Sequence, residues 1–261
     1  MSKAKPILIV EDVSISFGGL QALYQCSFSM KKGEIFSLIG PNGAGKTTIF
    51  NIINALYKPD GGRILFEDEN LLSLKPHQVA NRGIARTFQN IELFNEMTVL
   101  ENVLTGRHFY YRSGIMANFF ATQRSKVEEE KNKDYILDLL RFLNLEPFKD
   151  QKAVDLSFGI QKRVELARAM ALNPKILLLD EPAGGLNPQE TENLMDLIQL
   201  IRDERGISIL LVEHDMRLVM GLSDRICVLH FGQKIAEGTP KEIQQNKNVI
   251  EAYLGTTKHD A

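Results

Sequence analysis

Three glycines, a lysine and two threonines fall within nine residues, Gly40-Pro-Asn-Gly-Ala-Gly-Lys-Thr-Thr48, and match the pattern G-x-x-x-x-G-K-[ST]. The glycines let the backbone curl so that successive N–H groups point at phosphate oxygens. Lys46 can reach the β- and γ-phosphates, and the Thr47 hydroxyl can bind Mg²⁺. The segment therefore predicts a nucleoside-triphosphate site.

The residues on both sides of this loop predict the strand and the helix that the motif requires. An apolar run, Glu34–Ile39, precedes the loop, and a helix-compatible segment, Thr47–Leu56, follows it. The positive end of the helix dipole then faces the phosphate together with the loop N–H groups, which a chance glycine-rich turn would not provide. The candidate nucleotide contacts in the loop are Gly40, Asn42, Gly43, Ala44, Gly45, Lys46, Thr47 and Thr48.

Two adjacent carboxylates are the second candidates for chemistry. Asp180 and Glu181 follow the apolar run Ile176–Leu179, which predicts a buried parallel strand. Ligands bind at the carboxyl ends of such strands, so Asp180 is placed to hold Mg²⁺ together with Thr47. Glu181 can orient or deprotonate an attacking water. The alternative is that the pair merely ends a strand before the turn at Pro182, but the upstream phosphate loop favours the metal and base roles.

A second anion site is predicted in the segment Leu156-Ser-Phe-Gly-Ile-Gln161, which leads into a helix-compatible run. Ser157 offers a hydroxyl and Gly159 a close backbone N–H at this helix N-terminus. Ser157 also suits the N-cap position, and the two roles are compatible. Two separate phosphate-binding helix starts make sense if the second serves a nucleotide held by a partner chain.

The elements that must position these residues alternate between helix and strand beyond residue 160. We expect helices at 160–172, 188–205 and 214–222, and strands at 176–179, 207–212 and 225–229. This alternation is typical of a parallel sheet covered by helices. Residues 7–39 instead predict short strands, and the charged run 126–133 is most simply a solvated helix face.

The bulk composition is that of an ordinary globular domain. The chain has 261 residues, 44% of them hydrophobic, and its 31 basic and 33 acidic residues give a net charge of −2. No basic excess points to nucleic acid. The N-terminus does not resemble a secretory signal, and no apolar run is long enough to span a membrane. Cys26 and Cys227 are expected to be buried thiols in a reducing compartment.

The motifs together resemble those of the ATP-binding cassette (ABC) ATPases. Leu156–Gln161 looks like the family's signature, commonly L-S-G-G-Q, and Gln89 and His214 complete the family's motif order. The resemblance implies a catalytic set of Glu181, His214 and Gln89, a metal set of Thr47, Gln89 and Asp180, and Ser157 and Gly159 acting on the nucleotide of an opposing chain. Phe158 and Ile160 depart from the signature, which leaves ribose-side contacts in doubt.

The resemblance also assigns roles to residues that would be unremarkable alone. Phe17 matches the aromatic that stacks on adenine, although on periodicity alone it could be a core aromatic. Gln89 alone would be read as a surface residue and His214 as a helix-start residue. Gly184-Gly-Leu-Asn187 matches the loop that crosses the seam of a cassette dimer.

The implied fold is α/β: a P-loop NTPase (RecA-like) core with a parallel sheet, an N-terminal antiparallel β subdomain and an inserted α-helical subdomain. We expect one ABC domain over residues 7–255. Within it we place the β subdomain at 7–35 and 62–68, the helical subdomain at 90–160 with an insertion at 108–133, and a C-terminal helical tail at 236–255.

Several segments resemble, more narrowly, the ATP-binding subunit of branched-chain amino-acid importers; they are Ala85–Phe94, Met97–Asn102, Glu181–Pro188, Glu213–Met220 and Ile250–Gly255. This implies an ATPase that uses ATP and Mg²⁺ to power uptake of leucine, isoleucine or valine. The implied partners are two transmembrane permeases, a second ABC ATPase (a related chain or a second copy) in a head-to-tail ATP sandwich, and indirectly a solute-binding protein. The chain would be a peripheral subunit on the cytoplasmic face of the inner membrane.

Other functions share part of this pattern. Relatives that serve urea, amides, lipid or lipopolysaccharide look similar at this level. ABC ATPases of DNA repair and chromosome structure carry long coiled coils, and ribosomal ones carry two cassettes, whereas this chain has a short insert and a single phosphate loop. A GTPase would need an N-K-x-D motif, which is missing. The apolar residues Ile91, Leu93, Phe94 and Met97 could line a groove for a permease helix or pack within their own subdomain.

Overall fold

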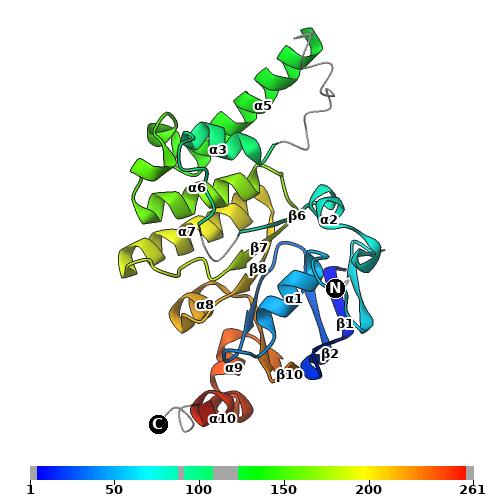
Figure 1. The fold of residues 1–261 in the computed structure, drawn as a ribbon. Coiled ribbons are helices and arrows are strands. Elements are labelled where there is room, and N and C mark those ends of the chain that lie inside the picture. Colours follow the sequence, from blue (N-terminus) through cyan, green and yellow to red (C-terminus); the bar gives the residue numbers. More distant parts are fainter. Residues whose placement is uncertain (1–4, 88–90, 108–122, 257–261) are drawn as a thin grey trace. The chain divides into compact units, whose positions relative to one another are not determined.

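The computed structural model describes residues 5–87, 91–107 and 123–256, which form two compact units. The first comprises residues 1–84 and 175–261, and the second comprises residues 85–174. Gln89 and most of the expected insertion at 108–133 lie outside the described residues. Figure 1 labels the elements of both units.

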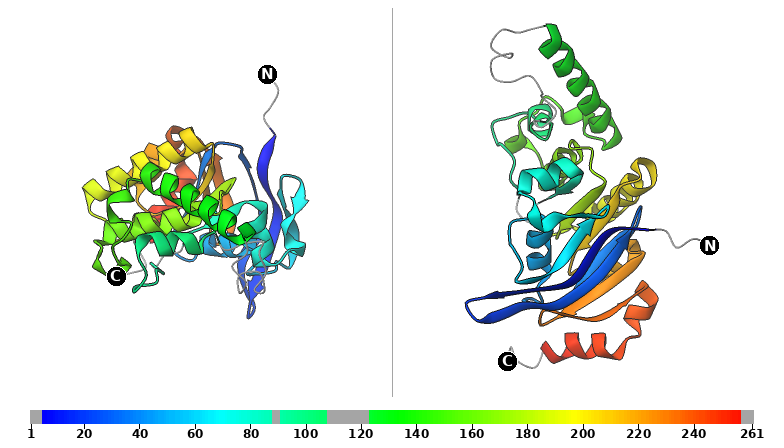
Figure 2. Two further views of the ribbon diagram at one scale, coloured as in Figure 1. Left: turned by 90° about the horizontal axis from the view of Figure 1, so that it is seen from above. Right: turned by 90° about the vertical axis from the view of Figure 1, so that its right-hand side faces the viewer.

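An antiparallel sheet opens the first unit. It contains β1 (Pro6–Phe17), β2 (Leu20–Lys31), β4 (Gly61–Phe66) and β5 (Glu69–Asn70), in the order β2-β1-β4-β5. Alternate residues of β1 such as Leu8 and Val10 are buried, as a sheet with one face on the core requires. Figure 2 shows the long β1–β2 hairpin in blue, lying against β10, and Tyr24 N–H donates to the Gly232 carbonyl there at 2.9 Å.

A second sheet carries the apolar runs that the sequence predicted as buried strands. Its strands are β3 (Ile35–Ile39), β6 (Ile84–Arg86), β7 (Ile176–Asp180), β8 (Ser208–Val212), β9 (Arg225–His230) and β10 (Gln233–Gly238), in the order β10-β9-β3-β8-β7-β6. The β9–β3, β3–β8 and β8–β7 pairs are parallel, and β10 is antiparallel to β9. Every residue of β3, β7 and β8 is buried, because helices and the other sheet cover both faces.

The helices of the first unit are α1 (Lys46–Ile53), α2 (Pro76–Arg82), α7 (Pro188–Arg205), α8 (Met216–Leu222), α9 (Pro240–Gln244) and α10 (Lys247–Thr256). Asn187 caps α7 and Thr239 caps α9, each in a reciprocal bond with a glutamate three residues on. The expected helical tail at 236–255 begins later than predicted, because residues 236–238 belong to the edge strand β10.

The second unit is helical. It contains α3 (Val99–Thr105), α5 (Gln123–Phe142) and α6 (Phe158–Met170), with short 3-10 turns at Glu146–Phe148 and Ala153–Asp155. Thr98 and Glu101 form a capping box at the start of α3. The solvated-face prediction for 126–133 is wrong at Asn132, which is 5% exposed and whose side-chain oxygen accepts from Arg107 at 2.9 Å.

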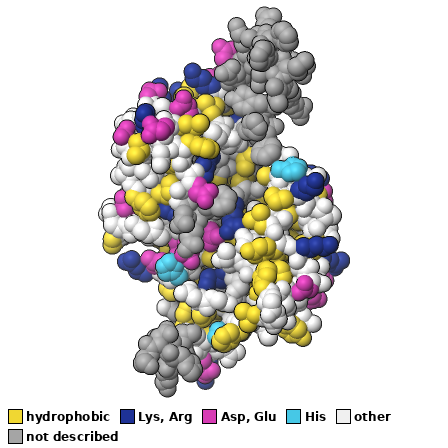
Figure 3. All heavy atoms as spheres, in the orientation of Figure 1, with side chains coloured by type: hydrophobic (Ala, Val, Ile, Leu, Met, Phe, Trp, Pro, Cys, Tyr) yellow, Lys and Arg dark blue, Asp and Glu magenta, His cyan; other side chains and the backbone are white. Residues whose placement is uncertain are grey.

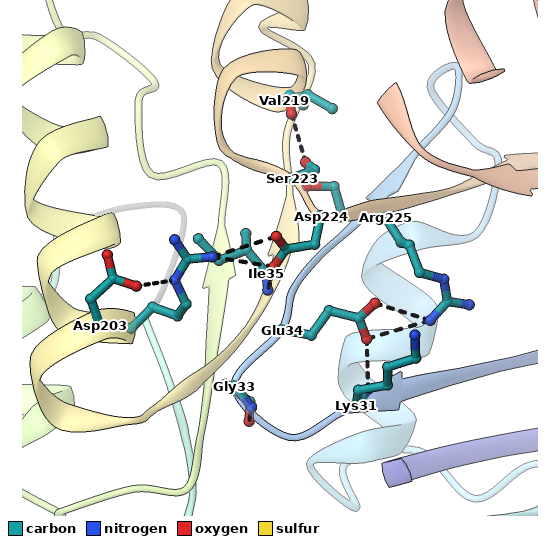
Figure 4. A network of polar contacts seen from close by, with 12 residues as sticks. Lys31, Gly33, Glu34, Ile35, Asp203, Val219, Ser223, Asp224 and Arg225 are labelled. Atoms are coloured by element: carbon teal, nitrogen blue, oxygen red, sulfur yellow. Dashed lines mark hydrogen bonds and ion pairs between the residues drawn. The ribbon is translucent and has the colours of Figure 1, made fainter. Parts of the chain in front are cut away.

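An ion-pair network around the buried Glu34 joins the strand ends of the first unit on the side away from the phosphate loop. Glu34, 5% exposed, accepts from the Arg225 guanidinium at 3.0 Å and from Lys31 N–H at 2.6 Å. Asp224 accepts from Ile35 N–H at 2.8 Å, and Figure 4 shows these contacts converging where β3 begins. The network fixes the amino end of the strand whose other end carries the phosphate loop.

The α/β class, the P-loop core and both predicted subdomain types are confirmed. None of the helices within the described residues combines the length and apolarity needed to cross a bilayer. On the face displayed in Figure 3, lysine and arginine side chains are interspersed with aspartate and glutamate.

Candidate nucleotide-binding site

The phosphate loop connects the carboxyl end of β3 to α1, as the sequence predicted. Two of its glycines are required by the space around them. A Cβ on Gly40 (φ 152°) would lie 2.1 Å from the Leu229 carbonyl oxygen, and a Cβ on Gly45 (φ 99°) would lie 2.6 Å from Leu23 Cδ2. The loop can therefore follow its curled path only with glycine at these positions.

Lys46 begins α1 and is buried beneath the loop. Its Nζ donates to the Gly40 carbonyl at 2.7 Å and to the Pro41 carbonyl at 3.0 Å. Burial lowers the pKa of Lys46, while the charges of Glu181 and Asp180 act in the opposite direction. The ammonium group is thus held close to both carboxylates predicted for catalysis and metal binding.

A pocket of about 460 Å³ opens over this loop. Its floor is formed by Asn42 to Thr48, its sides by Leu20, Gln21 and Ala22 of the β1–β2 hairpin, and Glu181 and Phe231 complete the lining. The pocket brings together seven of the eight predicted loop contacts with the predicted base, Glu181. Gly40 is the predicted loop contact that is not among the lining residues.

Phe231 is a pocket residue that the sequence argument missed. It lies in the β9–β10 turn with φ 45° and is 78% exposed. The turn is fixed on both sides of the pocket, since Gly232 N–H donates to the Ala44 carbonyl at 3.2 Å and the Gly232 carbonyl accepts from Tyr24. An aromatic residue directly before a turn glycine was the signal that could have identified it.

Phe17 does not line this pocket. Its ring is 44% exposed and meets Tyr57 edge-on, with centroids 5.2 Å apart. The core-aromatic alternative for Phe17 is therefore wrong, and the stacking role on adenine stays a prediction.

The two predicted carboxylates stand at the carboxyl end of β7. Asp180 is 4% exposed, and Glu181 follows it with φ 47°, a left-handed conformation that costs a non-glycine residue about 1–3 kcal/mol. Neighbouring backbone groups hold this turn, because Glu181 N–H donates to the Val212 carbonyl at 2.8 Å and the Glu181 carbonyl accepts from Gly184 at 3.1 Å. Strained backbone of this kind is concentrated at functional sites.

His214 lies beside Glu181. Its Nδ1 is 3.8 Å from Glu181 Oε2 and 3.7 Å from Glu213 Oε2, and its side chain is largely exposed. The helix-start interpretation of His214 is wrong, because α8 begins at Met216 and Asp215 is its N-cap. Lys46, Asp180, Glu181 and His214 therefore form one cluster in the first unit.

The signature segment belongs to the second unit. Ser157 occupies the N-cap position of α6, but its hydroxyl makes no capping hydrogen bond. The turn is held instead by Gln161, whose side-chain amide donates to the carbonyls of Ala153 and Leu156 at 3.0 and 3.1 Å. Ser157 is exposed, Gly159 is half-buried, and Phe158 is 45% exposed. The helix start thus presents Ser157 and Phe158 outward.

The donor set suits Mg²⁺ better than a soft metal. No group of three or more His, Cys, Asp or Glu side chains that could hold a metal occurs among the residues described. Thr47 instead offers a hydroxyl in the pocket lining, and Asp180 offers a carboxylate close to Lys46. Mg²⁺ accepts few protein oxygens when phosphate and water complete its coordination.

A glycine-rich loop on a parallel sheet, with a lysine and two strand-end carboxylates beneath it, defines a P-loop nucleoside triphosphatase. Comparison with protein families is more specific. Residues 23–184 match the ABC transporter family, and residues 233–259 match the family described as branched-chain amino acid ATP-binding cassette transporter. The chain belongs to the ABC transporter family of ATPases.

Known relatives span the whole chain. It is 43% identical over 252 residues to the high-affinity branched-chain amino acid transport ATP-binding protein BraF of Pseudomonas aeruginosa, covering 97% of this chain and 99% of BraF. It is 44% identical to the corresponding protein LivG of Escherichia coli K12, with the same coverage. The crystal structure of the ADP conformation of MJ1267, an ATP-binding cassette of an ABC transporter, superposes with a TM-score of 0.85 at 35% identity, covering 97% and 100% of the two chains.

Proposed function

We propose that this chain is the ATP-hydrolysing subunit of an importer of branched-chain amino acids. The observation that carries the proposal is the full-length identity of 43–44% to transport ATP-binding proteins named for those substrates. The subunit would lie at the cytoplasmic face of the inner membrane beneath two permeases, supplied by a solute-binding protein.

In the proposed mechanism the phosphate-loop N–H groups and Lys46 hold the β- and γ-phosphates. Thr47, Asp180 and Gln89 would hold Mg²⁺, which supplies charge neutralisation on those phosphates when it is bound. Glu181 accepts the proton of the attacking water, and His214, at 3.8 Å from that carboxylate, contacts the γ-phosphate.

Hydrolysis would require two cassettes. The exposed Ser157 and the half-buried Gly159 at the start of α6 would act on the nucleotide held by the opposing chain. The dimeric structure of MJ0796, a bacterial ABC transporter cassette, has a TM-score of 0.74 and 30% identity over 89% of this chain, and it supports such pairing.

The test is purification of the tagged chain from detergent-solubilised membranes, followed by reconstitution with the permeases that accompany it. We expect ATP-dependent uptake of labelled leucine, with isoleucine and valine as competitors. Uptake of urea, amides or lipid without leucine transport would refute the substrate assignment, and recovery without any membrane partner would refute the transport role.

A further inference from the structure

Glu213 directly follows β8 and had no predicted role of its own. Its side chain is 1% exposed, although it carries a carboxylate. A buried carboxylate is tolerated only where hydrogen bonds replace its lost hydration. The partners of Glu213 therefore indicate why this group is placed here.

Three backbone N–H groups from two separate turns donate to this carboxylate. Oε1 accepts from Ala183 at 2.9 Å, in the turn that follows Glu181. Oε2 accepts from His214 at 2.8 Å and from Asp215 at 3.2 Å, in the turn that follows β8. One carboxylate thus joins the carboxyl ends of two neighbouring parallel strands.

These two turns carry the two side chains assigned to hydrolysis. The His214 imidazole lies between Glu181 and Glu213, at 3.8 and 3.7 Å from their nearest oxygens. Glu213, His214 and Ala183 also line a common pocket of about 150 Å³, which is separate from the phosphate-loop pocket. Glu213 itself does not line the phosphate-loop pocket, so a change at Glu213 should act on the hydrolytic pair without altering the phosphate loop.

We propose that Glu213 is a positioning residue for ATP hydrolysis, which fixes the turn after Glu181 against the turn that carries His214. The inference rests on the proposed roles of Glu181 and His214. Only a carboxylate supplies an acceptor oxygen to each turn. A glutamine has one acceptor oxygen, and its NH₂ group would face N–H donors on the other side.

The test is Glu213→Gln in the full chain, assembled with its partners, with kcat and KM for ATP measured below the melting temperature. We expect kcat to fall by about tenfold or more, because misplacing a reacting group by about 1 Å can cost about a hundredfold. KM should stay within about twofold, since the phosphate loop is unaltered.

Glu34→Gln is the matched control. Glu34 is also a buried carboxylate that accepts from a backbone N–H and a side chain, but it belongs to the network at the opposite end of β3. Its loss should lower the melting temperature and leave kcat unchanged. An equal fall of kcat in both variants would assign the effect to general destabilisation and overturn the proposal.

A double-mutant cycle separates positioning from an independent effect. If Glu213 acts by holding His214 opposite Glu181, Glu213→Gln should cost less than about threefold in a His214→Ala background. Equal losses in both backgrounds would overturn the proposal. Where Glu213→Gln does not fold, Glu213→Asp, which keeps the charge but is too short to serve both turns, takes its place.

The outcome for the wild-type protein distinguishes this inference from the function on which it rests. A wild-type complex without ATP hydrolysis would refute the proposed function. A wild-type complex that hydrolyses ATP, together with a folded Glu213→Gln variant of normal kcat, would refute only the role of Glu213.

Discussion

At the scale of single residues, Glu181 combines a strained backbone with a position between Lys46 and His214. We predict that Glu181→Gln binds ATP normally but loses about 10²–10⁴ in hydrolysis rate and accumulates as an ATP-bound dimer, since only the base is removed. Turnover assays with size-exclusion chromatography in ATP test this. Lys46→Ala should instead lose ATP binding, because the phosphates lose the positive charge of Lys46. Near-normal turnover of Glu181→Gln would remove Glu181 from the catalytic role.

Phe231 offers a second residue-scale test, because its side chain is 78% exposed, its φ is 45°, and its ring contacts the ring of the neighbouring His230, with centroids 4.3 Å apart. Phe231→Gly removes the backbone strain but adds entropy to the unfolded chain, so the free energy of unfolding should change by less than about 1 kcal/mol. The Kd for ATP should nevertheless rise by about two- to tenfold, the value of one aromatic contact. Fluorescence titration with a labelled nucleotide measures this, and an unchanged Kd would separate Phe231 from nucleotide binding.

The two cysteines are confirmed as buried free thiols, and burial raises the pKa of Cys26 to about 12. Its stabilising effect is therefore complete below the unfolded value of 9.0 and is lost as the pH rises from there to about 12. At pH 10 the loss should be about 1.4 kcal/mol relative to neutral pH. Urea unfolding of the wild type and Cys26→Ala tests this, because the variant should lose less stability over the same pH interval.

At the scale of elements, the sequence predicted the strands whose residues are buried along their whole length. β3, β7 and β8 are buried throughout and mainly apolar, so the sequence predicted all three as strands. β10 was missed because only Ile235 and Ala236 interrupt its polar run, and its pairing with β9 at the sheet edge is a tertiary effect. The role of Glu213 was equally invisible, since it depends on a bond to Ala183, 30 residues away.

The start of α6 gives the element-scale prediction. Because the Ser157 hydroxyl makes no capping bond and Gln161 holds the turn, Ser157→Arg should leave the helix and the fold intact. ATP binding by the isolated chain should be unchanged, whereas hydrolysis by the assembled pair should fall by at least about tenfold. Calorimetric titration of the monomer and turnover of the complex test the two halves. Loss of monomer binding would contradict action on the opposing chain's nucleotide.

At the scale of the whole molecule, a transporter subunit must convert nucleotide binding into movement of its permeases. The segment after Gln89 is the predicted contact. Its backbone is anchored within the second unit, since the buried Asn102 side chain accepts from Phe94 N–H at 2.8 Å and donates to the Phe94 carbonyl at 3.0 Å. Arg168 further donates to the Glu92 carbonyl at 2.5 Å. Hydrogen bonds therefore hold the backbone of this segment at Glu92 and Phe94 within the second unit.

Several apolar side chains of this segment and its neighbour Val154 are exposed and do not belong to the core. Phe94 is 53% exposed, Met97 38% and Val154 53%, and Val154 N–H donates to the Asn95 carbonyl, so these residues are neighbours. Ile91 and Leu93 are half-buried, so these two residues pack partly within their own subdomain, as the alternative prediction held. A small exposed apolar surface on a rigid loop fits an amphipathic helix of a membrane partner.

We therefore predict that Phe94→Asp leaves the isolated protein folded and able to bind ATP, because the bonds of Asn102 involve only the backbone of residue 94. The variant should no longer co-purify with its permeases, and uptake of branched-chain amino acids should be lost. Asn102→Ala is the matched contrast: it removes a buried amide with four bonds to the segment and should lower the melting temperature. If Phe94→Asp unfolds the protein, Phe94 belongs to the core. If the variant still assembles with the permeases and transports amino acids, Phe94 is not part of the permease contact.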